Sequence, residues 1–121
     1  MSHNNFNEDL QTRTKLFAVQ VVHFYTLNCK SGDELKIIGK QLFRSGTSVA
    51  ANFRAYIRGR SDAERFAKLC IVVEEIDETL FWFELIEDSG LLNPSLILKL
   101  KQEALELLKI FSSVRSKLKT K

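Results

Sequence analysis

Five basic side chains share one face of the segment from residue 33 to residue 58. At about 100° per residue on a helix they fall within an arc of roughly 80°, over a length of roughly 30 Å. They are Lys36, Lys40, Arg44, Arg54 and Arg58. Such a row suits a phosphate backbone, and because it contains no aromatic residue for stacking on bases, it predicts RNA or DNA binding with little sequence preference. A face that is merely solvated, or that pairs with acidic residues of another subunit, is the alternative.

Patterns typical of catalysis or metal binding are missing. A di-iron bundle needs Glu-x-x-His on two helices, whereas this chain has no such motif and only two histidines, His3 and His23. The four carboxylates within residues 74–78 splay around a helix and favour ion pairing. The hydroxyls at residues 45–48 lack a Gly-x-Ser-x-Gly elbow. We therefore expect no metal, no cofactor and no enzymatic activity; an unrecognised enzyme would need a pocket with converging polar groups.

Ser45 and Asn52 fall at the edge of the apolar face of the same segment. A polar side chain at such a position must find partners, and it can fix the register between two helices at some cost in stability. We predict that both residues are structural polar residues at a helix contact.

Glycines and capping residues divide the chain into four nearly equal segments. Gly32, Gly59 and Gly90 mark the breaks. Ser61 lies three residues before a glutamate, which is the spacing of a capping box. Asn93 followed by proline predicts an N-cap and a first helical residue. Four helices follow, the first spanning about residues 9–30.

The apolar residues repeat at the period of a helix. In the third and fourth segments they recur at alternating steps of three and four residues, which is the pattern of a bundle seam. Because short connections favour antiparallel neighbours, we predict an all-α, up-down-up-down four-helix bundle. It forms a single domain over residues 1–121, with a polar leader at 1–8 and a basic tail at 115–121.

Composition limits the class and location of the protein. The 121 residues are 45% hydrophobic and 27% charged, a globular balance, and no apolar run is long enough to cross a membrane. The first residues lack the basic start and apolar stretch of a secretory signal. Cys29 and Cys70 fit reduced packing residues of a cytoplasmic protein.

The third segment also predicts self-association. Opposite its seam it carries apolar and acidic residues together, a surface too apolar for open water. They are Ile71, Glu74, Glu78, Trp82 and Leu85. The alternative is that Trp82 folds back over a neighbouring helix of the same chain.

Four separated runs resemble one bacterial family. They are residues 13–18 (RTKLFA), 39–55 (GKQLFRSGTSVAANFRA), 58–61 (RGRS) and 74–85 (EEIDETLFWFEL). The chain is therefore similar to the "four helix bundle protein" family, which includes proteins encoded by intervening sequences of 23S ribosomal RNA genes. Accessory variability proteins of diversity-generating retroelements are relatives. Arg54 departs from the acidic residue that many members carry.

The resemblance implies a helical bundle that forms a homopentamer without established catalysis. In the retroelement branch it implies binding to a reverse transcriptase and to nucleic acid. Two hypotheses lead: an oligomeric binding module that touches RNA or DNA through its basic face, and a protein–protein scaffold or accessory subunit without nucleic-acid contact. Exposure of the basic residues in the oligomer separates them.

Overall fold

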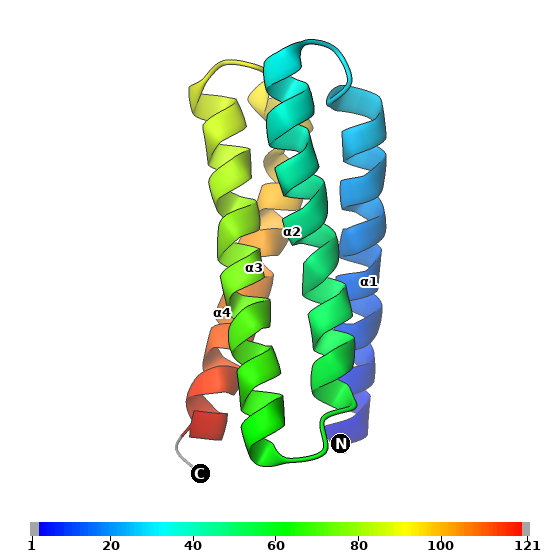
Figure 1. The fold of residues 1–121 in the computed structure, drawn as a ribbon, viewed down its shortest axis with the longest axis vertical. Coiled ribbons are helices and arrows are strands. Elements are labelled where there is room, and N and C mark those ends of the chain that lie inside the picture. Colours follow the sequence, from blue (N-terminus) through cyan, green and yellow to red (C-terminus); the bar gives the residue numbers. More distant parts are fainter. Residues whose placement is uncertain (1–2, 120–121) are drawn as a thin grey trace.

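The computed structural model describes residues 3–119 as four long helices and one short 3₁₀ turn. These elements are α1 (His3–Asn28), α2 (Asp33–Ile57), α3 (Asp62–Asp88), η1 (Pro94–Leu96) and α4 (Leu98–Lys119). Successive helices run in opposite directions, and the described residues contain no strand (Figure 1). The predicted all-α, up-down-up-down bundle is confirmed.

Side-chain caps begin α3 and the turn before α4. The Ser61 hydroxyl accepts a hydrogen bond from the backbone N–H of Glu64 at 3.1 Å, as the capping-box spacing predicts. The Glu64 carboxylate accepts from the backbone N–H of Arg60, one residue before the cap. Asn93 accepts from the backbone N–H of Ser95 at 3.0 Å. This cap starts η1 rather than an α-helix, so α4 begins at Leu98, later than predicted.

Two helices extend beyond their predicted ends. Helix α1 begins at His3 and includes most of the polar leader, because no glycine or proline interrupts it and Leu10, 4% exposed, anchors its first turns. Helix α4 continues to Lys119, so the basic tail is helical to that residue. Residues 1–2 of the leader and 120–121 of the tail lie outside the described part of the chain.

The core lies along the bundle axis, and each long helix contributes one fully buried phenylalanine. These are Phe17, Phe53, Phe83 and Phe111. The rings of Phe53 and Phe111, from α2 and α4, lie 5.1 Å apart between centroids. Burying one such side chain stabilises the fold by about 1.5–3 kcal/mol. Because each helix contributes one of the four rings, this stabilisation depends on the packing of all four helices.

Helices α1 and α2 approach closely at two glycines. A Cβ atom on Gly46 would lie 2.9 Å from both methyl carbons of Val21. A Cβ atom on Gly39 would lie 2.5 Å from the Cβ atom of Cys29. Both contacts are shorter than ordinary van der Waals distances, so the absence of a side chain at these two glycines allows the neighbouring helix to pack closely.

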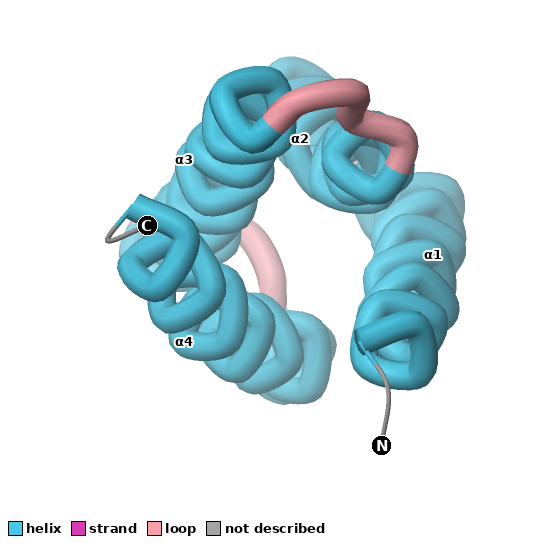
Figure 2. The backbone as a smooth tube through the Cα atoms, turned by 90° about the horizontal axis from the view of Figure 1, so that it is seen from below, coloured by secondary structure: helices cyan, strands magenta, loops and turns pink. Residues whose placement is uncertain are grey.

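The boundary between α1 and α4 is the loosest in the bundle (Figure 2). Arg13 spans it and donates two hydrogen bonds to the Glu103 carboxylate, at 2.7 and 2.8 Å. These hydrogen bonds raise the pKa of the Arg13 guanidinium above its ordinary value. A two-point ion pair therefore links the first helix to the last.

Candidate nucleic-acid interface

The five predicted cations form one exposed row, which we call the α2 ridge. Its members are Lys36, Lys40, Arg44, Arg54 and Arg58, and each is solvent-exposed in the chain. The opposite side of α2 is buried, with Leu42, Val49 and Phe53 in the core. One helix thus presents a core face and a cationic face.

The α2 ridge is free of internal ion pairs. Within residues 3–119, no carboxylate oxygen lies within 4.0 Å of a ridge nitrogen. Some basic residues elsewhere do have carboxylate partners: Arg13, Arg60, Arg65 and Lys101 form ion pairs in the chain. The ridge therefore keeps its positive charge available to an outside anion.

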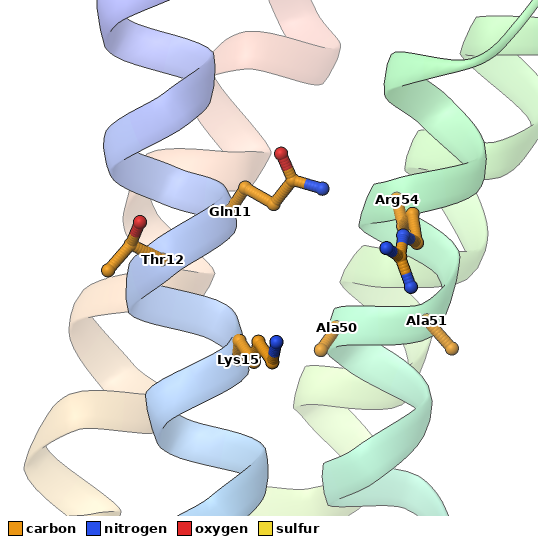
Figure 3. Close-up of a pocket in the computed structure, with 6 residues that line it drawn as sticks. All are labelled: Gln11, Thr12, Lys15, Ala50, Ala51 and Arg54. Atoms are coloured by element: carbon orange, nitrogen blue, oxygen red, sulfur yellow. The ribbon is translucent and has the colours of Figure 1, made fainter.

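A depression between α1 and α2 adds a cation that the sequence analysis missed. It measures about 340 Å³ and is lined by Gln11, Thr12, Lys15, Ala50, Ala51 and Arg54. Lys15 and Gln11 extend from α1 toward α2, and Arg54 stands across from them (Figure 3). Lys15 therefore lies beside the α2 ridge because α1 packs against α2. The periodicity of a single helix cannot predict this, since Lys15 and Arg54 are on different helices.

Ser45 and Asn52 lie at the contact between α2 and α3. The Thr79 hydroxyl donates to the Ser45 oxygen at 3.0 Å, and both residues are buried. The Asn52 side-chain amide donates to the carbonyl and the hydroxyl oxygens of Ser48, at 3.0 and 2.8 Å. The Ser48 hydroxyl in turn donates to the Glu75 carboxylate at 3.2 Å. These polar contacts link the two helices, and a structural role for both residues stays our prediction.

The predicted self-association face of α3 is only partly open. Glu74 is exposed, whereas the other four members, Ile71, Glu78, Trp82 and Leu85, are half-buried in the chain. Trp82 packs against the core, and its buried indole N–H has no hydrogen-bond partner among the described residues. The neighbouring Phe81, which the sequence analysis left out, is 51% exposed.

Two further findings bear on the class of protein. No helix in the described part of the chain is long and apolar enough to cross a membrane. Among the same residues, no group of three or more His, Cys, Asp and Glu side chains is placed to hold a metal ion.

The fold and the α2 ridge define the class, a small antiparallel four-helix bundle with one cationic outer face. A family model described as 23S rRNA-intervening sequence protein matches residues 8–113, and the chain belongs to that family. The predicted family is therefore confirmed.

A solved structure supports the same assignment. It is a crystal structure of a protein with unknown function from the S23 ribosomal protein family of Bacteroides thetaiotaomicron. The two chains are 28% identical, with a TM-score of 0.82, and the match covers 91% of this chain and 97% of that one. The comparison with curated proteins finds no significant match.

Proposed function

We propose that the protein is a non-enzymatic, oligomeric binding protein that contacts the phosphates of RNA or DNA through the α2 ridge. The observation that carries the proposal is that all five ridge cations are exposed and lack a carboxylate partner in residues 3–119. Cations held in a row and free of internal partners can release the counterions of a polyanion. Repetition of the ridge in an oligomer multiplies these contacts.

The proposal includes no reaction and no cofactor. In its support, the buried hydroxyls of Ser45 and Thr79 bond to each other rather than to a base. The family description names no reaction either. Because Cys29 and Cys70 are unbridged, the proposal places the protein in the reducing cytoplasm.

Titration with fluorescent RNA and with duplex DNA tests the proposal. At about 50 mM salt both should bind, and affinity should fall steeply toward about 200 mM, because binding depends on phosphate contacts. The double variant R44A/R58A should weaken binding, whereas K99A/K109A removes two exposed cations from α4 and should not. Absence of binding by the wild-type protein at low salt, or equal affinities for the two variants, would contradict the proposal.

A protein–protein scaffold is the second candidate function. It is favoured by apolar side chains that stand open on the outer face of α1, where Leu16 is 55% exposed and Leu27 is 80% exposed. In this function the α2 ridge meets acidic residues of a partner protein instead of phosphates. The titration above separates the two, because a scaffold binds neither nucleic acid.

A further inference from the structure

The depression between α1 and α2 brings cations from two helices to one place. Lys15 and Gln11 reach into it from α1, and Arg54 faces them from α2 (Figure 3). We propose that this depression holds one backbone phosphate of the bound nucleic acid, with Lys15 and Arg54 on either side. The inference rests on the proposed function. It places one specific phosphate site beside the α2 ridge and adds Lys15, from α1, to the residues that bind the nucleic acid.

The side chains at the depression are those that recognise phosphate oxygens. The Arg54 guanidinium can donate two parallel hydrogen bonds, and the Lys15 ammonium supplies a compact positive charge. The Gln11 amide, which points toward α2, adds a neutral donor at the same rim. Each of these donors can bind a backbone phosphate, which carries no sequence information, in agreement with the absence of aromatic residues from the ridge.

No described residue neutralises the two cations. Neither Lys15 nor Arg54 has a carboxylate oxygen within 4.0 Å among residues 3–119. Before Lys15 on α1, Asp9 lies on another face of the helix, and Glu8 lies on the same face but seven residues away, about 10 Å along the axis. Two like charges that line one depression repel each other, so an anion placed between them is attracted to both.

The position of the depression favours a phosphate that belongs to a longer chain. The widest interval in the α2 ridge separates Arg44 from Arg54, which is about 15 Å along the helix axis. Lys15 lies beside Ala50 and Ala51, inside that interval. It therefore supplies positive charge where α2 has none. The short side chain of Ala50, which points toward α1, leaves room for an anion to approach the depression of about 340 Å³.

Variants of Lys15 test the site separately from the α2 ridge. In the same titrations, K15Q and R54Q should each weaken binding by about tenfold, the effect of losing a hydrogen bond to a charged group. K15Q should also lower the salt slope by about 0.9 on duplex DNA, the value expected for one lost phosphate contact. K15R should retain affinity, and K109Q, which removes one exposed charge from α4, is the matched control.

The double variant K15Q/R54Q asks whether the two cations share one phosphate. If they do, the double variant should weaken binding by less than the product of the two single effects, because the first loss already releases the phosphate. Multiplicative effects, or a K15Q variant that behaves like K109Q, would overturn the phosphate site while the proposed function stands.

Wild-type protein that binds no nucleic acid overturns both the phosphate site and the proposed function. Variants that change the mass of the protein in solution, with nucleic-acid affinity intact, assign the depression to carboxylates of a second copy and overturn it as well.

Discussion

At the scale of single residues, the hydrogen bonds of the Asn52 side chain predict a contribution to stability. Its amide donates to two oxygens of Ser48, whose hydroxyl reaches Glu75 on the next helix. We expect N52A to destabilise the protein by about 1 kcal/mol, the usual net loss for such hydrogen bonds, and to lower Tm by about 3–5 °C. Thermal unfolding followed by circular dichroism measures this loss. Q41A on the exposed side of α2 is the control, and equal melting of the two variants would refute the structural role.

The two cysteines should differ strongly in reactivity. Cys29 is fully buried, and desolvation raises the pKa of its thiol from 9.0 to about 11, whereas Cys70 is half-buried. Since the thiolate is the nucleophile, alkylation at about pH 8 should be at least about a hundredfold slower at Cys29. Mass spectrometry after a short iodoacetamide pulse locates the modified thiol, and unfolded protein, in which both react, serves as the control. Comparable rates in the folded state would show that the Cys29 site opens.

The same thiol gives a pH dependence with a definite sign. Because the folded-state pKa is raised, the unfolded chain gives up the thiol proton first. The contribution of Cys29 to stability is therefore complete below about pH 9 and is lost as the pH rises to about 11.

At the scale of elements, the α1–α2 contact depends on a missing side chain. Alanine at position 46 gains about 1 kcal/mol of helix propensity over glycine, but its Cβ atom would collide with Val21. Val21 is buried and branched at Cβ, so it has little freedom to move, and overpacking costs about 1–3 kcal/mol. We expect G46A to be less stable than the wild type by about 1 kcal/mol.

A second substitution shows whether that loss comes from the collision. V21A removes the two methyl groups, so G46A/V21A should be more stable than the sum of the two single losses predicts. A51G at an exposed position of α2 measures the propensity alone. Chemical denaturation gives all four free energies, and additive losses would mean that the helices separate without strain.

The elements also show what periodicity can and cannot predict. The repeat of three and four residues in α3 predicts a seam through Phe66, Leu69, Val73, Ile76, Leu80 and Phe83. The last five are buried, whereas Phe66, near the start of the helix, is half-buried. Three more residues of that helix, Val72, Thr79 and Ile86, are buried as well. They broaden the buried arc because α3 packs between α2 and α4. A repeat of three and four residues predicts the residues that face one neighbouring helix. It does not predict the residues that face a second neighbouring helix.

The candidate site could also be predicted only in part from the sequence. The α2 ridge was predictable because its five cations lie on one helix, where about 100° per residue fixes their directions. Lys15 was not predictable in this way, because its place beside Arg54 depends on the register between two helices. That register is set by the close approach at Gly39 and Gly46. The two glycines lie seven residues apart on one side of α2, but their spacing does not indicate which residues of α1 lie beside α2.

At the scale of the whole molecule, two outer faces carry large exposed apolar side chains. On α1, Leu16, Val19 and Leu27 stand open, at 55%, 42% and 80% exposure. On α3, Phe81 is 51% exposed beside the half-buried Trp82. The two helices lie on different sides of the bundle (Figure 2). Contact between unlike faces of successive copies is heterologous, and it closes into a ring when the rotation allows.

We therefore predict a homo-oligomer in which the α1 face of one copy meets the α3 face of the next. Light scattering at micromolar concentration should give a multiple of 13.9 kDa, and the pentamer implied by the family resemblance corresponds to about 70 kDa. A charge on either face should dissociate it, because burying an unpaired charge is costly. L27E on α1 and L85E on α3 should both lower the mass, whereas Q102E on the exposed side of α4 should not. A wild-type mass of 13.9 kDa contradicts assembly, and a response to only one of the two apolar substitutions contradicts contact between unlike faces.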